Sequence, residues 1–403
     1  MKIALLHTHF GGPAGGGGGV RQMTELARNL TDLGHEATVC IHDHDFDDAF
    51  TGASDGFELR SVEQGPYSIP VGARRALKQI WRQMPQLAKI IPADVDVINA
   101  HEFPAIHAGR IAARKLGVPL VWTRNDYTVF EFALIPDETP VEPMSILQRA
   151  LRAVVSAPDA RAARSADSIV VLDQRNRRMV RRCYRRDAEI IRSGPAPHFY
   201  SARSKAEARA RLGIPEDDFV VLGVGILMPM RRFDDLIDAV ASLGPRSYAK
   251  TRIIGSDHIN PGYADHLDQR IAELGLADRV SLIRAAVSED HLADAYAAAD
   301  LFVFPNSKQT WGLAPLEAIA ARTPVVVSRG AGVHEVLEGK AGVQLVDALA
   351  PDQLAEAITR VETNPGDFDV ESTREWVREN LNNRAYAENM LNLFERVIAN
   401  SRK

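Results

Sequence analysis

The sequence contains little cysteine, no long hydrophobic run and no surplus of basic residues. Cys40 and Cys183 are the only cysteines among 403 residues, which argues against a disulfide framework or a cysteine metal site and favours a reducing cytoplasm. No stretch approaches the roughly 20 apolar residues that a membrane-spanning helix needs. The formal net charge of −5 gives no general attraction for nucleic acid or for an anionic membrane. We therefore expect a cytoplasmic protein, without a nucleic-acid partner, in which any basic site is local.

The overall amino-acid composition is that of a folded globular protein, with 45% hydrophobic and 25% charged residues. Apolar, β-branched runs alternate with helical stretches almost throughout, a pattern that predicts a doubly wound α/β fold with parallel strands. The expected strands are residues 3–6, 37–41, 95–100, 120–123, 168–172, 219–225, 251–255, 280–283, 301–304 and 324–328. The expected helices include residues 21–34, 106–116, 233–243 and 314–321, and the tail from Trp376 onward is also helical in pattern.

The alternation pauses once, in the stretch IIRSGPAPHF, where Gly194, Pro195 and Pro197 interrupt any regular element. A length of 403 residues suits two domains of about 200 residues each. We therefore expect one Rossmann-like domain over residues 1–195 and a second, of similar architecture, over residues 196–378. A terminal helix over residues 379–403 is expected to return to the first domain.

A glycine-rich stretch, GGPAGGGGGV at residues 11–20, lies between the first expected strand and the first expected helix. A strand, a glycine loop and a helix start place free amide groups and the positive end of a helix dipole at one point, which suits a phosphate. A flexible turn is the alternative, because a glycine run alone is weak evidence of a binding site.

The most informative stretch is PNSKQTWGLAPLEAIAARTPVVVSRGAGVHEV, residues 305–336. It contains a strand end, a turn at Gly312 and a helix that begins near Ala314. The amides of Gly312, Leu313 and Ala314 are expected to bind an anion, while Glu317, one turn into the helix, can accept hydrogen bonds from sugar hydroxyls. This combination fits a nucleotide sugar.

This stretch resembles the retaining glycosyltransferases of family 4, in which the region reads E-G-F-G-L-x-x-L-E-A-x-A-x-G-x-P-V-V. The resemblance extends over nearly the whole chain and also includes the opening, where Gly18 and Gly19 precede a helix. It implies the GT-B fold, with two facing Rossmann-like domains, parallel sheets and a cleft between them. The matching positions are Trp311, Gly312, Leu313, Leu316, Glu317, Ala318, Ala320, Pro324, Val325, Val326, Gly332, Glu335 and Val336.

The resemblance implies roles for single residues in donor binding. Gly18 and Gly19 would let the backbone approach the donor diphosphate or the acceptor, and Glu317 would accept from the nucleotide ribose. Arg231 stands in place of the family's lysine that clamps the diphosphate. The family's arginine is replaced by Ile226, and Arg232 is the neighbouring cation that could serve instead.

Two further positions depart from the family's pattern, and both are expected near the reaction. The first glutamate of the motif is replaced by Gln309, and the family's histidine, after the strand at residues 120–123, is replaced by Asn125, followed by Asp126. The family's route is front-face substitution, in which the leaving diphosphate helps to deprotonate the acceptor. Because that route depends mainly on placement and electrostatics, it tolerates Gln309 and Asn125.

We therefore expect a metal-independent retaining glycosyltransferase without a cofactor, with the nucleotide diphosphate sugar on the second domain and a small-molecule or glycan acceptor on the first. The replaced positions leave two alternatives open. One is a non-catalytic protein that binds sugar nucleotides, and the other is a transferase with an atypical donor or acceptor nucleophile.

Histidines and acidic residues near strand ends give weaker indications. His9 adjoins the glycine loop, and His101 and Glu102 follow a strand at the end where ligands of α/β folds bind, so all three are possible cleft residues. A structural role is equally open for His101. The run His42-Asp43-His44-Asp45 resembles metal ligands but has no distant partner fixed by sequence, and we do not expect a metal there.

The stretch RNRRMVRRCYRR at residues 175–186 is strongly basic. The favoured interpretation is a solvated helix face. The alternative is a basic surface for an anionic acceptor or for lipid headgroups, so contact with a membrane surface is open but not favoured.

Overall fold

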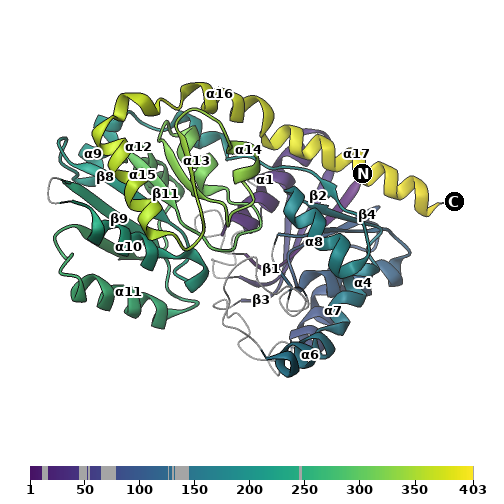
Figure 1. Ribbon diagram of the computed structural model, residues 1–403. Helices are drawn as coiled ribbons and strands as arrows, with labels where there is room; N and C mark the ends of the chain where they lie inside the picture. The colour runs from purple at the N-terminus through teal and green to yellow at the C-terminus, as the bar shows by residue number, and fades with distance from the viewer. Residues whose placement is uncertain are drawn as a thin grey trace. The chain divides into compact units, whose positions relative to one another are not determined.

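The computed structural model divides the chain into two compact units (Figure 1). It describes residues 1–10, 17–44, 52, 55–64, 79–125, 127–128, 131, 145–244 and 247–402. Unit 1 comprises Met1–Ser193 together with Asn383–Lys403, and unit 2 comprises Gly194–Asn382. No helix within these described ranges is both long enough and apolar enough to cross a membrane.

Within the described residues, unit 1 is built on a seven-stranded parallel sheet in the order β3-β2-β1-β4-β5-β6-β7. The inner strands are buried along almost their whole length, as expected for strands covered by helices on both faces. The strands are β1 Lys2–Phe10, β2 Glu36–His44, β3 Glu58–Gln64, β4 Val97–His101, β5 Leu120–Thr123, β6 Ser168–Val171 and β7 Glu189–Ile190. The helices are α1 Gly18–Asp32, η2 Gln79–Gln83, α3 Met84–Lys89, α4 Ala105–Leu116, α6 Ile146–Val155, α7 Ala157–Arg164, α8 Gln174–Tyr184 and α17 Asn383–Ser401.

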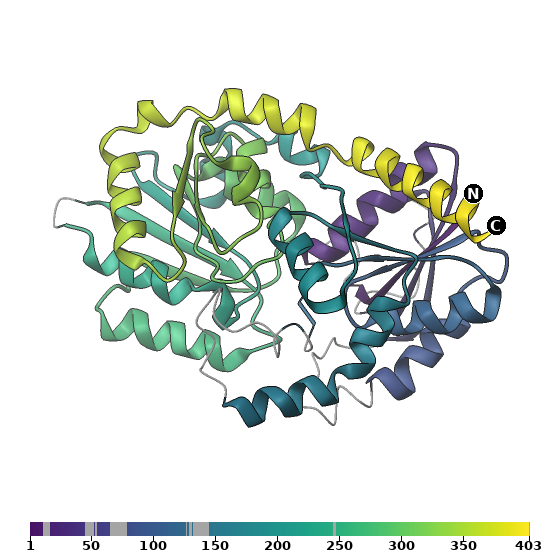
Figure 2. The same ribbon diagram turned by 45° about the vertical axis from the view of Figure 1, so that its right-hand side comes forward.

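Alternate residues of the unit 1 strands contribute to two cores, one on each face of the sheet. On one face, Ala4 and Leu6 of β1 pack with side chains of α3, α4, α7 and α8. On the other, Ile3 and Leu5 pack with α1 and with the chain's last helix, α17, which the amphipathic spacing of its apolar residues directs inward. Figure 2 shows α17, in yellow, alongside α1, in purple.

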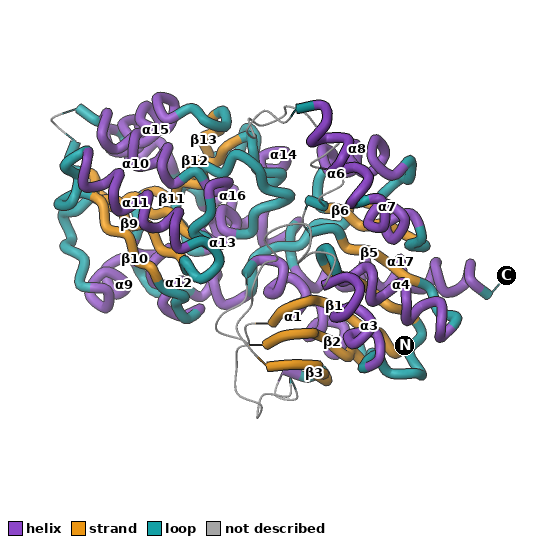
Figure 3. The backbone as a smooth tube through the Cα atoms, turned by 90° about the horizontal axis from the view of Figure 1, so that it is seen from below, coloured by secondary structure: helices purple, strands orange, loops and turns teal. Residues whose placement is uncertain are grey.

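Unit 2 repeats this architecture, and its described residues form a six-stranded parallel sheet in the order β10-β9-β8-β11-β12-β13. In Figure 3 the orange strands of each unit lie among purple helices. The strands are β8 Phe219–Val224, β9 Ala249–Gly255, β10 Val280–Arg284, β11 Leu301–Phe304, β12 Val325–Ser328 and β13 Val343–Val346. The helices are η3 Pro197–Ser201, α9 Lys205–Leu212, η4 Pro229–Arg231, α10 Phe233–Ser242, α11 Pro261–Glu273, α12 Glu289–Ala298, α13 Ala314–Ala320, α14 His334–Leu337, α15 Pro351–Thr363, η5 Pro365–Phe368 and α16 Glu371–Asn380.

The expected doubly wound α/β fold is confirmed, and it gives each sheet one topological switch point. The strand order reverses between β1 and β4 in unit 1 and between β8 and β11 in unit 2. Ligands of open parallel sheets bind outside the carboxyl ends of the strands at such points. The residues that follow these four strands are therefore the first place to look for function.

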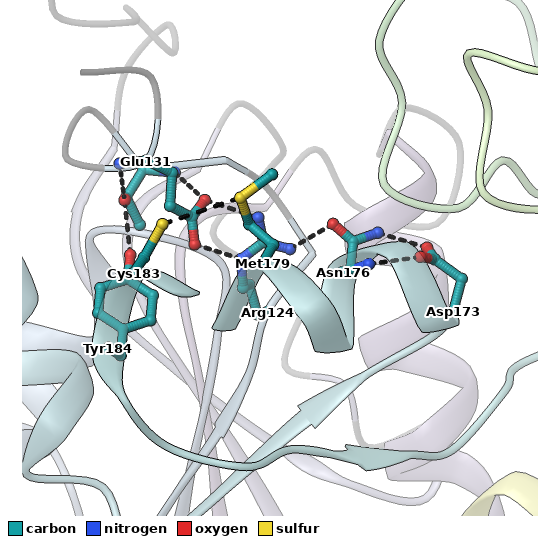
Figure 4. Close-up of polar contacts among 8 residues, drawn as sticks. Arg124, Glu131, Asp173, Asn176, Met179, Cys183 and Tyr184 are labelled. Carbon is teal, nitrogen blue, oxygen red and sulfur yellow. Dashed lines mark hydrogen bonds and ion pairs between the residues drawn. The ribbon is translucent and has the colours of Figure 1, made fainter. Parts of the chain in front are cut away.

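A fully buried ion pair fixes the chain where it leaves β5 (Figure 4). Arg124 donates from Nε and Nη2 to the two carboxylate oxygens of Glu131, each at 2.6 Å, and from Nη1 to Asn176 Oδ1 at 2.6 Å. Asn176 is in turn held by Asp173, the N-cap of α8. Burial lowers the pKa of Arg124, but the charge of Glu131 outweighs that effect and keeps the pKa raised.

Thr128 completes this network. Its amide donates to Glu131 Oε2 at 2.9 Å, and its hydroxyl lies 2.7 Å from the hydroxyl of Tyr184. The segment after β5 is thereby tied to α8 through buried polar contacts. Such contacts stabilise a fold only when every partner is present.

We predict that Glu131→Gln lowers the free energy of unfolding by about 3–5 kcal/mol, because it leaves the Arg124 charge buried and uncompensated. The matched control is Asp187→Asn, which breaks exposed pairs with Arg177 and Arg181 and is expected to cost less than about 1 kcal/mol. Urea denaturation followed by circular dichroism measures both. Equal losses for the two variants would contradict the assigned importance of burial.

Candidate functional site

A buried carboxylate lies at the switch point of unit 1. Glu102 follows β4 and is 6% exposed, and its Oε1 accepts hydrogen bonds from the Thr8 amide at 2.9 Å and from the Thr8 hydroxyl. Its Oε2 lies 3.4 Å from His7 Nε2. Burial raises the pKa of Glu102 to about 7, although the Thr8 hydrogen bonds oppose this shift. Such a shift in a residue at a strand end is typical of functional sites.

His7 and Asn125 face the start of α1. The backbone N–H of His9 donates to His7 Nδ1 at 3.2 Å, so Nδ1 is the accepting nitrogen and Nε2 carries the proton. A Cβ built on Gly19 would lie 3.7 Å from both His7 Nε2 and Asn125 Nδ2. The structure thus brings together Gly19, His7 and Asn125 from three separate parts of the chain.

Gly18 and Gly19 lie in the first turn of α1 and not in the loop before it, because the helix begins three residues earlier than its apolar spacing predicts. The N-cap is Gly17, without a side-chain cap, and the first turn contains no acidic residue. Helix amides at such a start point toward incoming ligands. Residues 11–16 of the expected glycine loop lie outside the described residues.

The other predicted cleft residues of unit 1 have different surroundings. His101 is fully buried, and within the described ranges neither of its ring nitrogens has a hydrogen-bond partner. Burial, and then the neighbouring His7, lowers the pKa of His101 to about 3, so its ring is neutral at physiological pH. His9 lies at the end of β1, paired in register with Asp43. Asp126 lies outside the described residues.

A cation held by two amides lies at the switch point of unit 2. Arg231 ends the short helix after β8, and its Nη1 donates to Gln309 Oε1 at 2.7 Å, in the loop after β11. When the side-chain amide of Asn306 is assigned the orientation that satisfies both of its groups, it accepts from the same Nη1 at 2.8 Å and donates to the Arg231 carbonyl at 3.2 Å. Both hydrogens of Nη1 are therefore used, and by neutral groups, which orient the guanidinium without cancelling its charge.

Backbone contacts join the loop after β11 to the loops after β8 and β12. The Ser307 amide donates to the Met230 carbonyl at 3.0 Å, and the Gln309 amide donates to the Gly330 carbonyl at 3.0 Å. A Cβ on Gly330 would lie 2.3 Å from the Asn306 carbonyl oxygen, so only glycine fits there. Gln309 is thus fixed by its backbone as well as by its side chain.

Arg232, the second expected cation, is already engaged. It donates to both carboxylate oxygens of Asp235, at 2.9 and 2.5 Å, and approaches Asp234 at 3.1 Å. The hydrogen bonds to Asp235 raise the pKa of Arg232 despite its partial burial. Because these aspartates begin α10, Arg232 has a structural use, and Arg231 is the stronger candidate for a phosphate contact.

Glu317 is almost fully buried in α13, and its Oε2 accepts from the Tyr296 hydroxyl at 2.9 Å. Tyr296 packs edge-on against Phe302 of β11. The expected anion-binding amides of Gly312, Leu313 and Ala314 lie at the start of this helix, and Gly312 has the positive φ of 115° that favours glycine. Glu317 therefore has at least one structural contact beside the ligand role that the sequence predicts.

Sequence reasoning did not identify Thr8 and Asn306, the residues that orient Glu102 and Arg231. Thr8 lies within β1, 94 positions from Glu102. A usable indication existed for Asn306, which is a polar residue at the carboxyl end of a fully buried strand. No local pattern indicates Thr8.

Among the described residues, one set of side chains could hold a metal ion. Ligand atoms of His42, Asp43 and Glu63, at the ends of β2 and β3, lie within 4.8 Å of one another. His42 already contacts Asp43 through Nδ1 and Gln86 through Nε2. Of the acidic residues that follow in the sequence, Asp45, Asp47 and Asp48 lie outside the described residues.

Several arginines of the basic run make local contacts. Arg177 and Arg181 both donate to Asp187, at 2.8 to 3.0 Å. Arg186 donates to the carbonyls of Arg164 and Asp167, at 2.8 and 3.2 Å. These contacts give part of the basic stretch a structural use.

Comparison with known proteins identifies both units. Residues 16–198 match the model "Glycosyltransferase Family 4", and residues 204–384 match the model "Glycosyl transferases group 1". The chain is 28% identical over 376 residues to a D-inositol 3-phosphate glycosyltransferase of Streptomyces scabiei, covering 85% of this chain and 79% of that protein. The D-inositol 3-phosphate glycosyltransferase 1 of Catenulispora acidiphila is 28% identical over 390 residues, covering 90% of this chain and 87% of that protein.

Solved structures show the same fold at lower identity. A sucrose-phosphate synthase from Thermosynechococcus elongatus superposes with a TM-score of 0.82 at 22% identity, covering 99% of each chain. The Anabaena protein HepE, in complex with UDP-glucose, superposes with a TM-score of 0.72 at 20% identity, covering 98% of this chain and 99% of that one. The chain therefore belongs to the family 4 glycosyltransferases of GT-B fold and is an enzyme of that class.

Proposed function

We propose that this enzyme transfers a sugar from a nucleotide diphosphate sugar, held by unit 2, to a hydroxyl of a small-molecule or glycan acceptor, held by unit 1, with retention of configuration. The observation that carries the proposal is Arg231, a cation oriented by two neutral amides at the switch point of unit 2. A diphosphate is the anion that such a charge-assisted donor suits.

The relatives support both substrates. HepE was solved with UDP-glucose, which favours a nucleoside diphosphate sugar as the donor of this chain. The relatives named for D-inositol 3-phosphate favour a polyhydroxylated ring as its acceptor. Cyclitols and sugars both offer several hydroxyls as hydrogen-bond donors.

The residues present suit front-face substitution. In that route the departing diphosphate takes the proton of the acceptor hydroxyl, and the enzyme stabilises charge on the leaving group. Arg231 would stabilise that charge, and Glu317 would accept from the ribose. Gln309, held beside Arg231, would contact the transferred sugar, and Asn125 would hydrogen-bond a hydroxyl in unit 1. We propose that no metal is needed, because Arg231 supplies positive charge at the diphosphate.

Two measurements test the proposal. Thermal shift with UDP, GDP and ADP should reveal a nucleotide that raises the melting temperature, since a ligand that binds only the native state stabilises it. Hydrolysis of the matching nucleotide sugars should follow, and should continue in EDTA. Failure of every nucleotide to bind would overturn the proposal, and loss of hydrolysis in EDTA would overturn the metal-free part.

We predict that Arg231→Ala weakens binding of the nucleoside diphosphate by about 1.5–3 kcal/mol, the scale of a hydrogen bond to a charged group. Isothermal titration calorimetry measures the change. The control is Arg211→Ala, which removes an exposed arginine paired with Asp294 and should leave the affinity unchanged. An unchanged affinity for Arg231→Ala would remove Arg231 from the site.

We predict that Glu317→Gln lowers the donor affinity by about 1.5 kcal/mol or more while the protein stays folded. The amide keeps an oxygen for the Tyr296 hydroxyl but loses the charge that a ribose hydroxyl would prefer. Tyr296→Phe, which removes the structural partner and keeps the carboxylate, should lower affinity less. A collapse of the melting temperature with unchanged affinity in the folded fraction would show that Glu317 is only structural.

We predict that Gln309→Glu changes the preference among donor sugars by roughly 1–3 kcal/mol, since a buried polar group left unpaired is costly. The new carboxylate would form an ion pair with Arg231 and would no longer offer an amide donor to the sugar. The measurement is the ratio of kcat/KM for two nucleotide sugars in wild type and variant. An equal change in kcat/KM for every donor would show that residue 309 does not distinguish one donor sugar from another.

A further inference from the structure

We propose that Glu102 binds the acceptor through its Oε2 atom, and that the acceptor presents an uncharged hydroxyl, and not a phosphate, to this point of unit 1. The inference rests on the proposed function and deepens it, because it assigns a specificity-determining residue and the chemical class of the group that it recognises. Three features of Glu102 carry it: an anchored oxygen, a second oxygen that is not saturated, and a constrained backbone.

The first oxygen of Glu102 is fully engaged. Oε1 accepts from both the amide and the hydroxyl of Thr8, so two donors from one residue of β1 hold it in place. A carboxylate anchored in this way keeps its orientation when a ligand arrives, because its rotamer is already set. The other carboxylate oxygen, Oε2, is then the one that can contact the ligand.

The second oxygen retains capacity. The contact of Oε2 with His7 Nε2 is 3.4 Å long, beyond the usual 2.7–3.2 Å range of an N–H···O hydrogen bond. A carboxylate oxygen can accept two hydrogen bonds. Catalytic and binding contacts are often long before the substrate is present. The Glu102 side chain is 7% exposed, so the carboxylate is largely shielded from bulk water.

The backbone holds Glu102 in a conformation that a non-glycine residue seldom adopts. Its φ is 60°, in the left-handed region, which costs of order 1–2 kcal/mol for an ordinary residue. Two hydrogen bonds compensate: its amide donates to the Thr123 carbonyl at 3.1 Å, and its carbonyl accepts from Trp122 Nε1 at 3.1 Å. Backbone strain of this kind is commonly found at residues whose side chains have a function.

The charges around Glu102 indicate what it can bind. Its titratable neighbours are His7 of β1 and His101 of β4. His101 is neutral because burial lowers its pKa to about 3, and His7 presents an N–H to Oε2. A ligand at this point would meet the negative charge of the ionised Glu102 carboxylate beside a neutral His101. A phosphate placed against it would be repelled, whereas a hydroxyl donates a hydrogen bond to it.

The ratio of sugar transfer to donor hydrolysis tests this inference. The probes are UDP-glucose with glycerol, myo-inositol and glucose, compared with D-inositol 3-phosphate and glucose 6-phosphate. Transfer to at least one neutral polyol is expected. Because burial raises the pKa of Glu102 to about 7 and the carboxylate is the accepting form, the KM for the polyol should fall as pH rises through 7.

The variant Glu102→Gln should lower the ratio of transfer to hydrolysis by roughly tenfold or more and flatten the pH dependence of KM, because a neutral group replaces a charged acceptor. Glu102→Asp keeps the negative charge but shortens the side chain by one methylene. It should raise the KM for the polyol more than it lowers kcat. Melting temperatures are measured for both. The control Glu36→Gln makes the same change at the exposed first residue of β2, at the opposite edge of the strands and separated from β4 by β1, and should change neither quantity.

Several results would overturn the assignment. Transfer to the phosphate esters alone, failure of every neutral polyol as acceptor, or an unchanged KM and pH profile in folded Glu102→Gln would each do so while UDP-glucose hydrolysis continues. Absence of donor binding and hydrolysis in the wild type would instead overturn the proposed function, and this inference with it. The two failures are therefore distinguishable.

Discussion

The ion pair between Arg124 and Glu131 is the constraint on which the candidate site of unit 1 depends. Both side chains are fully buried, so neither charge can be solvated, and the pair holds only because each nitrogen and oxygen meets a partner. Arg124 directly precedes Asn125, and its third contact reaches Asn176 of α8. The network that anchors α8 therefore also fixes the backbone from which Asn125 approaches α1. The same contacts therefore contribute to the stability of unit 1 and to the position of Asn125.

The two units use the same topology with opposite charges. At the switch point of unit 1, Glu102 is held by donors from β1, and at that of unit 2, Arg231 is held by acceptors from the loop after β11. In each case one end of the charged group is fixed by contacts that leave its charge in place. A fixed cation suits a leaving diphosphate, and a fixed carboxylate suits a hydroxyl, so the difference in charge agrees with the proposed division of donor and acceptor between the units.

Burial explains which parts of the fold were predictable. The inner strands are apolar runs, and the sequence predicts each of them. The bounds of β5 agree with the expected residues 120–123, whereas β1 extends four residues beyond its expected end at residue 6. The sequence analysis missed β3, β7 and β13, which lie at sheet edges and have few fully buried side chains. Motif resemblance selected Arg231 and Gln309 but could not find their partner Asn306, because pairing between the loops after β8 and β11 arises only in the folded chain. The ligand roles of these residues remain predictions.

The departures from the family's pattern in unit 2 compensate one another. Relative to that pattern the chain lacks a cation, where Ile226 stands, and also lacks a carboxylate, where Gln309 stands. One positive and one negative charge are removed, so the net charge of the site is unchanged by the two replacements. The remaining cation, Arg231, is not neutralised by Gln309, whose amide oxygen accepts from it at 2.7 Å. An amide in this position keeps the orientation that a carboxylate would give, and it would leave more of the arginine's charge available to the proposed diphosphate.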